Sequence, residues 1–155
     1  MDVAKALRAC VLFKEFTPTG VTIMGAAFSA RSFRAGTTLF VEDTPADTML
    51  VIVEGKVCVT SQAKGKEKAI LGDLGPGEAL GELALLQHGQ RMCTATALDD
   101  VTVLEMKNSD FAKLLTEKPQ ACLKLLMAIV RHVGQQVAVN REAFKALAPN
   151  RKATG

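Results

Sequence analysis

The fold of this protein is decided by the stretch GPGEALGELALLQHGQRMCTATA, residues 75–97. The stretch has a glycine-rich beginning, a short apolar segment and a single arginine, Arg91. Its glycines Gly75, Gly77 and Gly81 are similar to the pattern of dinucleotide-binding loops, but the last gap is one residue too long. No strand–helix–strand unit surrounds them, so we reject a dinucleotide-binding fold.

The same stretch suits an anion if residues 82–86 form one helical turn directly after Gly81. The first N–H groups of a helix have no partner within it, and they lie at the positive end of the helix dipole. A glycine at position 81 lets a ligand approach the backbone, and the planar guanidinium of Arg91 suits a phosphate. Glu82 would repel phosphate, so it fits only another part of the ligand, such as a sugar hydroxyl. These residues therefore predict a compact nucleotide as the ligand.

Around this stretch, residues 29–107 consist of short segments with strand character that are separated by turn residues. Segment 49–53 is continuously apolar, whereas Val57 and Val59 alternate with polar neighbours. Such a pattern is typical of an all-β sandwich or barrel. We expect about eight short strands, and the pattern identifies most of them as 31–33, 37–41, 49–53, 56–62, 69–74, 94–97 and 101–107.

Helical patterns flank the β region on both sides. Residues 1–28 contain a first amphipathic segment and then Thr17-Pro18, a capping residue followed by a first-turn proline. Residues 108–148 contain a helix that Asn108 or Ser109 can cap and a longer one that begins near Pro119. The apolar positions of the longer helix recur every three or four residues, which predicts one buried face: Cys122, Leu126, Ile129, Val133 and Val137. We therefore expect a single domain over residues 1–155, mainly β with flanking helices.

Composition excludes several functional classes. The 155 residues include 19 Lys and Arg against 16 Asp and Glu, so the net charge of +3 gives no support to nucleic-acid binding. No uninterrupted apolar stretch approaches the roughly 18 residues of a membrane span, and the N-terminus is no signal peptide, so we expect a cytoplasmic protein. The four cysteines form no C-x-x-C pair and are expected to be reduced. The two histidines have no acidic partner at ligand spacing, so we expect neither a metal site nor catalysis.

Several segments together resemble the cyclic nucleotide-binding domain, a β-roll found in the catabolite activator protein, in cyclic-nucleotide-dependent kinases and in gated channels. The resemblance extends over about residues 12–137. It implies an eight-stranded double-stranded β-helix, or jelly roll, with N-terminal helices and a C-terminal helical tail. The segments that carry it are 33–40 (FRAGTTLF), 45–47 (PAD), 49–55 (MLVIVEG), 74–77 (LGPG) and 81–91 (GELALLQHGQR).

The resemblance implies a role for each residue of the segment 81–93, which is similar to the family's phosphate-binding cassette. Glu82 would bind the ribose 2′-hydroxyl, backbone N–H groups around Leu83 and Ala84 would meet the cyclic phosphate, and Arg91 would neutralise it. The expected ligand-binding residues are Gly81, Glu82, Leu83, Ala84, Arg91, Met92 and Cys93. Gly36 and Gly55 resemble turn glycines that shape the roll.

Three positions depart from the family pattern. Met92 occupies a position that is usually Ala, Ser or Thr, Leu80 replaces an aromatic residue, and Gln90 replaces a frequent proline. Members that prefer cGMP tend to have a hydroxyl at position 92. The ligand is therefore cAMP or cGMP, and the methionine favours cAMP.

Three functional hypotheses follow. The first is a cyclic nucleotide sensor that transmits its state through the C-terminal helix to a protein partner, with a possible homodimer through that helix. In it, residues 109–147 cover the base, with Lys124, Arg131 and Gln135 as alternative contacts. No DNA-reading module follows the long helix, so we expect no direct DNA binding. The second hypothesis is a ligand-free β-roll that serves protein interaction. The third is a metal enzyme of the related β-helix class, which would require histidine ligands.

Overall fold

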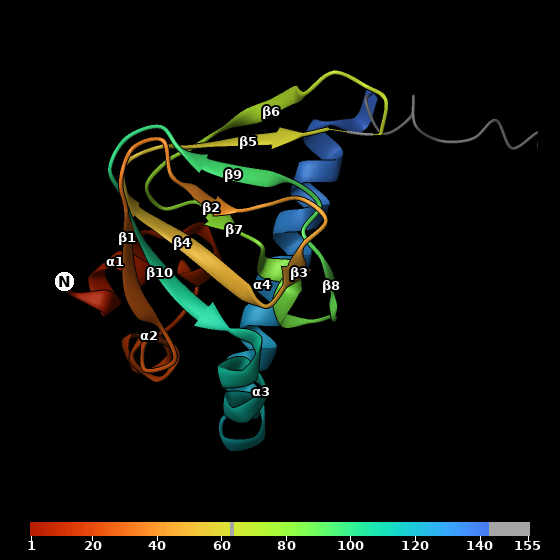
Figure 1. Ribbon diagram of the computed structural model, residues 1–155. Helices are drawn as coiled ribbons and strands as arrows, with labels where there is room; N and C mark the ends of the chain where they lie inside the picture. The colour runs from red at the N-terminus through yellow and green to blue at the C-terminus, as the bar shows by residue number, and fades with distance from the viewer. Residues whose placement is uncertain (63, 143–155) are drawn as a thin grey trace, which may run out of the picture.

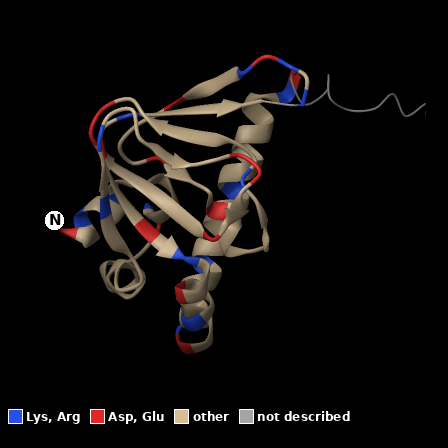
Figure 2. Cartoon of the chain, viewed as in Figure 1, with Lys and Arg blue, Asp and Glu red and all other residues tan. Residues whose placement is uncertain are grey.

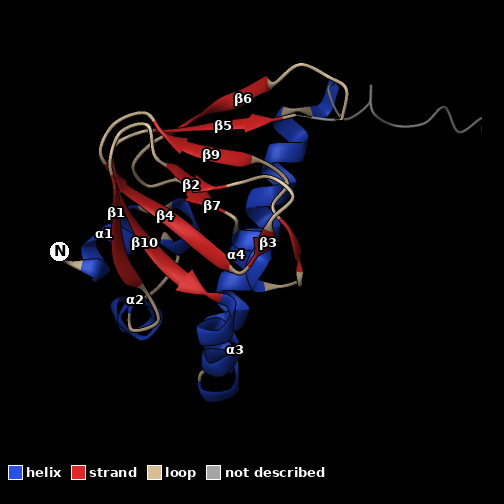
Figure 3. Ribbon diagram, in the orientation of Figure 1, coloured by secondary structure: helices blue, strands red, loops and turns tan. Residues whose placement is uncertain are grey.

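The structure is a computed structural model that describes residues 1–62 and 64–142. Two four-stranded antiparallel sheets form a β-roll, and helices cover one side of it (Figure 1, Figure 3). The first sheet has the order β1-β10-β4-β7 and the second the order β2-β9-β5-β6, while β3 and β8 pair separately. The strands are β1 (Ser29–Phe33), β2 (Thr38–Phe40), β3 (Pro45–Ala46), β4 (Thr48–Glu54), β5 (Val57–Ser61), β6 (Ala69–Leu74), β7 (Ala79–Leu80), β8 (Gly89–Gln90), β9 (Thr94–Ala97) and β10 (Val101–Lys107).

The helices lie at both ends of the described chain, except for one short 3-10 helix between β7 and β8. They are α1 (Val3–Ala9), the 3-10 helix η1 (Val11–Phe13), α2 (Pro18–Gly25), the 3-10 helix η2 (Glu82–Leu85), α3 (Asn108–Glu117) and α4 (Pro119–Val139). Thr17 caps α2 by accepting the Gly20 N–H, as its position before Pro18 predicts. The prediction that Asn108 or Ser109 caps α3 is wrong, because α3 already includes both residues and follows Lys107 without a side-chain cap.

The mainly β fold with flanking helices is confirmed, although the described residues contain ten strands where we expected about eight. The strands that the pattern did not locate, β3, β7 and β8, have two residues each. Such short strands carry no alternation, so their pairing is decided by neighbours distant in the sequence. The end of the predicted C-terminal helical region, residues 143–148, lies outside the described residues.

Two apolar clusters form on the two faces of the first sheet. Leu50 and Ile52 of β4 point into the roll, whereas Met49 and Val51 pack against the helices. Strand β10 divides its side chains in the same way, with Val103 in the roll and Leu104 against the helices. Because both faces of β4 are buried, its sequence is continuously apolar from Met49 to Val53.

Helix α4 buries only part of its predicted apolar face. Cys122, Leu125 and Ile129 are fully buried, and Leu126 and Val133 pack at the edge of the helical cluster. Val137, which we expected in the core, is 42% exposed because it lies beyond the helical cluster. By length and composition α4 is also the one helix among the described residues that could cross a membrane, yet its buried face packs on the roll.

The cysteines of the chain are all free thiols, as we expected. Cys10 and Cys122 lie in the helical cluster, while Cys58 and Cys93 are half-buried. Burial raises the pKa of the Cys10 thiol to about 11, so it stays protonated at neutral pH. Cys10 and Cys122 therefore contribute to stability through the packing of their side chains.

Gly55 shapes the β4–β5 turn, and a substitution there tests the turn. Its φ of +81° is strained for any residue with a Cβ, and an added Cβ would collide with the Asp100 carbonyl oxygen. Gly36 has a φ of +80° but open space around it. We therefore expect Gly55→Ala to lower the free energy of unfolding by about 1–3 kcal/mol more than the control Gly36→Ala does, measured by urea denaturation. Equal losses in the two variants would contradict the steric argument.

Candidate functional site

A cavity of about 140 Å³ opens beside η2 and the segment that follows β8. Its wall combines residues from distant parts of the chain: the end of β2, strand β3, the η2 turn, and residues 87–93. All seven residues that we predicted for the ligand site line this cavity. The full lining is Phe40, Ala46, Gly81, Glu82, Leu83, Ala84, Gln87, Gly89, Gln90, Arg91, Met92 and Cys93.

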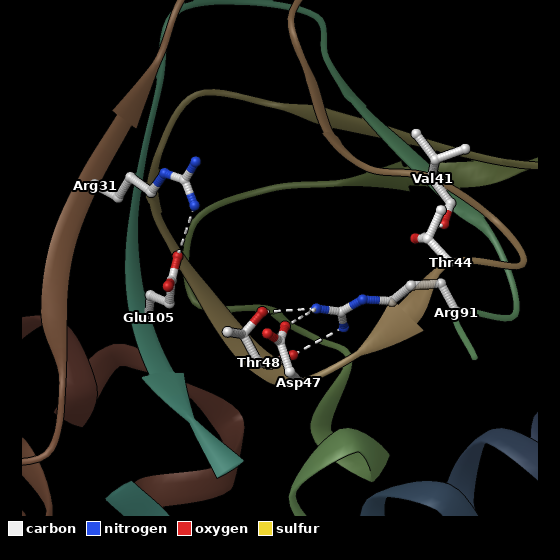
Figure 4. A network of polar contacts seen from close by, with 7 residues as sticks. All are labelled: Arg31, Val41, Thr44, Asp47, Thr48, Arg91 and Glu105. Atoms are coloured by element: carbon white, nitrogen blue, oxygen red, sulfur yellow. Dashed lines mark hydrogen bonds and ion pairs between the residues drawn. The ribbon is translucent and has the colours of Figure 1, made fainter. Parts of the chain in front are cut away.

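Arg91 is the buried charge of the site, with only 6% of its surface exposed. Its Nη1 donates to the Thr48 carbonyl oxygen at 2.8 Å and its Nη2 to the Thr48 hydroxyl at 2.6 Å. The guanidinium carbon also lies 4.2 Å from the centre of the Phe40 ring, a cation–π distance. Figure 4 shows the side chain extended toward Thr48 and Asp47. The arginine is thus held in the wall of the cavity and does not point into solvent.

The charge of Arg91 is only partly compensated. Among the described residues, its one carboxylate partner is Asp47, at 3.9 Å from Nη2, and the Asp47 side chain is 73% exposed. The Nε atom is buried and has no hydrogen-bond partner within residues 1–62 and 64–142. Burial lowers the pKa of Arg91, and the Asp47 carboxylate opposes that shift. A buried cation with one unpaired donor favours an anionic ligand, because an anion would supply both the missing charge and the missing acceptor.

The backbone of Arg91 is fixed by the loop between β2 and β4. The Arg91 N–H donates to the Thr44 carbonyl at 2.8 Å, and the Asp43 N–H donates to the Arg91 carbonyl at 2.9 Å. Strand β8 pairs with β3 immediately before, with Gln90 opposite Pro45. These contacts hold the arginine close to Thr48, which is 43 positions away in the sequence.

Gly81 is required by the close approach of the guanidinium. Its φ is +68°, in the left-handed region, and a Cβ at this position would collide with Arg91 Nη1. Gly81 begins the η2 turn, and its carbonyl accepts the Ala84 N–H at 3.0 Å. The predicted helical turn over 82–86 is therefore present as a 3-10 helix over 82–85. Of the amides that we expected to face an anion, that of Ala84 already has this internal partner.

Met92 and Cys93 complete the wall in different ways. Met92 is 73% exposed, so its long side chain stands at the edge of the cavity and does not fill it. Cys93 is half-buried against the cluster inside the roll, and burial raises the pKa of its thiol. Leu80, which replaces the family's aromatic residue, is buried within the same cluster.

Sequence reasoning missed Thr48, Asp47, Phe40 and Ala46 as parts of the site. Phe40 and Asp47 lie in segments that suggested the family, but no local pattern assigned them a role. Conversely, Lys124, Arg131 and Gln135 of α4 do not line this cavity; they line a separate groove with residues of η1 and the turn after it. There Arg131 pairs with Glu15 at 2.7 Å, and Lys124 lies 5.6 Å from the Phe16 ring.

The geometry bears on two alternatives to a nucleotide site, a cassette that forms only a surface ion pair and a metal enzyme. If the cassette were only a surface ion pair, Glu82 would pair with Arg91, but the carboxylate nearest to Arg91 is that of Asp47. For a metal enzyme, the part of the chain that the structure describes holds no group of three or more His, Cys, Asp or Glu side chains arranged around a common point. The wall therefore combines one buried cation, Arg91, with one carboxylate, Glu82, that does not pair with it.

Comparison with known proteins identifies the family of the chain. A model of the "Cyclic nucleotide-binding domain" matches residues 30–118, more than half of the chain. The chain belongs to the cyclic nucleotide-binding domain family.

Relatives of this cyclic nucleotide-binding domain include regulators from bacteria. The chain is 25% identical over 122 residues to the "CRP-like cAMP-activated global transcriptional regulator" of Mycobacterium tuberculosis, covering 79% of this chain and 54% of that protein. It is 26% identical over 129 residues to the "Cyclic AMP receptor protein" of Thermus thermophilus, covering 83% and 60%. The chain thus spans little more than half the length of these curated relatives.

A solved structure supports the same assignment. The N-terminal domain of a transcriptional regulator from Streptomyces coelicolor is 32% identical, with a TM-score of 0.75 over 88% of this chain and 95% of that domain. The β-roll and its flanking helices are therefore the architecture of the cyclic nucleotide-binding domain.

The contact between Thr48 and Arg91 can be tested by stability. Thr48→Val keeps the shape of the side chain but removes the acceptor of Arg91 Nη2. We expect the free energy of unfolding to fall by about 1–3 kcal/mol, because a buried charged donor loses its partner. Thr48→Ser keeps the hydroxyl, so its free energy of unfolding should fall distinctly less. Urea denaturation of the two variants measures the difference, and a Thr48→Val variant as stable as Thr48→Ser would contradict the role of the hydroxyl.

Proposed function

We propose that this chain is a regulatory domain that binds a cyclic nucleotide, cAMP in preference to cGMP, in the cavity beside η2. The observation that carries the proposal is the buried Arg91 guanidinium. Among the described residues, its charge has one distant carboxylate partner, and its Nε has no hydrogen-bond partner. A cyclic phosphate supplies one negative charge and several acceptors. Glu82 lies on the same wall and forms no ion pair with Arg91, and its carboxylate can accept a hydrogen bond from a ribose hydroxyl.

The expected affinity follows from the number of contacts. One charge-assisted contact to a phosphate contributes about 1.5–3 kcal/mol, and each backbone N–H bond contributes about 1 kcal/mol. The amides of Glu82 and Leu83 have no acceptor within the 3-10 turn, because they precede its first internal bond. Together with apolar contacts to Phe40 and Leu83, these terms suit a micromolar dissociation constant, about −8 kcal/mol.

The preference for cAMP rests on Met92. A thioether offers no hydroxyl to the exocyclic amino group of guanine, so this position gives cGMP no added hydrogen bond. The chain is proposed to regulate and not to catalyse, because its relatives are mainly binding regulators and burial raises the pKa of the Cys93 thiol, which disfavours the reactive thiolate in the cavity wall. We propose that it works as a single domain in the cytoplasm.

Transmission of the ligand state is proposed to run from η2 to the helices. Leu83 lines the cavity and also packs against the helical cluster, so a ligand that moves η2 would alter that packing. Leu85 of the same turn is buried in the cluster that contains Cys122, Leu125 and Ile129 of α4. A ligand shifts the position of α4 only by the difference between its affinities for the two arrangements.

The partner at α4 is proposed to be a second copy of the chain. Four of the exposed large apolar residues of this helix, Leu123, Met127, Val130 and Val137, are separated by four, three and seven positions, and Val139 at its end is exposed as well. Such spacing is the heptad pattern of helices that pack along their length. Lys124 and Arg131 are the only Lys, Arg, Asp or Glu residues of α4, which is otherwise uncharged (Figure 2). The effector that reads the dimer is proposed to be a protein and not DNA.

The binding proposal is tested by titration calorimetry with cAMP and cGMP. We expect the wild-type chain to bind both with cAMP favoured, and Arg91→Lys to bind at least about tenfold more weakly, because an ammonium lacks the planar fork and the Nε donor. Arg31→Lys is the matched control, since Arg31 is an exposed arginine that pairs with Glu105 away from the cavity.

Because a change at a buried arginine can disturb folding, Glu82→Gln provides a second variant on the cavity wall. It should weaken binding while thermal unfolding stays as in the wild type. A wild-type chain that binds neither nucleotide at millimolar concentration would refute the sensor proposal and leave the ligand-free interaction module.

The dimer proposal is tested by sedimentation equilibrium. Val130 is 66% exposed at the middle of the α4 stripe. We expect the wild type to sediment at twice the chain mass and Val130→Lys to dissociate at least about tenfold more readily, because the lysine charge would be buried between two apolar helices. Ile70→Lys, on an equally exposed apolar residue of β6, should dimerise as the wild type does. A monomeric wild type at high concentration would refute the proposal.

A further inference from the structure

Met92 is the large apolar side chain that stands at the mouth of the nucleotide cavity. It lines the cavity and is 73% exposed, whereas its neighbour Arg91 is buried in the wall. An apolar side chain of this size gains free energy when a flat apolar group covers it. The side chain is therefore available to a ligand and does not obstruct the cavity.

The remaining lining decides which part of a nucleotide reaches Met92. The cyclic phosphate is drawn to Arg91 and the ribose hydroxyl to Glu82, which leaves the purine as the large apolar part of the ligand. Among the described residues of α4, none lines the cavity, and Lys124, Arg131 and Gln135 lie in the other groove. In this arrangement no described residue of α3 or α4 covers the cavity in which the purine would lie.

We propose that Met92 covers the purine and supplies from the cassette itself the apolar contact over the base. This inference rests on the proposed binding of a cyclic nucleotide. The thioether is flexible and polarisable, and sulfur–aromatic contacts are favourable at about 5 Å. Such a contact does not read the polar edge of the base, so it strengthens the binding of adenine and guanine nucleotides alike.

The first test compares cAMP with ribose 3′,5′-cyclic phosphate, which has the same anionic ring and no base. Met92→Ala should bind cAMP roughly three- to tenfold more weakly, while its affinity for the base-free compound stays that of the wild type. Met92→Leu restores apolar contact and should recover most of the affinity for cAMP. Ile70→Ala is the matched control, because Ile70 is also 73% exposed but lies on β6, outside the cavity.

A second readout is independent of affinity. In protein labelled at the methionine methyl groups, the Met92 signal is assigned by its loss in Met92→Leu. Saturation with cAMP should move this signal upfield through the ring current of the purine, and the base-free compound should leave it in place. An unmoved signal at cAMP saturation refutes the contact.

The outcomes separate the two proposals. If the wild type binds cAMP and Met92→Ala binds it equally well or more tightly, Met92 does not cover the purine, although the cyclic nucleotide site stands. If the wild type binds neither cAMP nor the base-free compound, the proposed function itself fails. A loss of affinity for both compounds in Met92→Ala also refutes the inference, because it indicates a disturbed cassette.

Discussion

The site depends on one buried positive charge, the Arg91 guanidinium, which the surrounding protein groups compensate only in part. Arg91 is held by two hydrogen bonds to Thr48, by the Phe40 ring and by a distant Asp47 carboxylate. Removing a guanidinium from water is unfavourable unless its donors are satisfied, and here Nε is not. Gly81, which has no Cβ, leaves room for the guanidinium. The pairing of β3 with β8 fixes the backbone immediately before Arg91.

The same turn that borders the cavity also belongs to the helical core. Leu83 faces both, and Leu85 is buried beside the α4 residues Cys122, Leu125 and Ile129. A protein interior is densely packed, so a change at η2 has to be accommodated by the elements that touch it. Helix α4 meets this core with one face and leaves a second apolar face uncovered. The geometry thus connects the cavity with the helical core on which α4 packs through a single short turn.

The apolar pattern predicted the mainly β fold well, because a strand buried on both faces, such as β4, is a continuous apolar run; the β-roll itself was implied by the resemblance to the family. The candidate site residues were also identified correctly as neighbours, since Gly81 to Ala84 and Arg91 to Cys93 belong to one segment that closes around a short turn. The pattern of apolar and polar residues did not locate β3, β7 and β8, because these strands are too short to show alternation. It also failed for Val137, because helical periodicity cannot distinguish an apolar face against the core from one that faces outward.

The sequence by itself determined the family, the segment that forms the site and the presence of a single arginine suited to a phosphate, because these depend on residues close together in the chain. Only the tertiary structure decided what that arginine touches and that Met92 stands open at the mouth. Thr48 and Phe40 reach Arg91 across more than 40 positions of sequence, and such contacts follow from the closure of the roll. The partial compensation of the charge is therefore a property of the fold, and no local pattern encodes it.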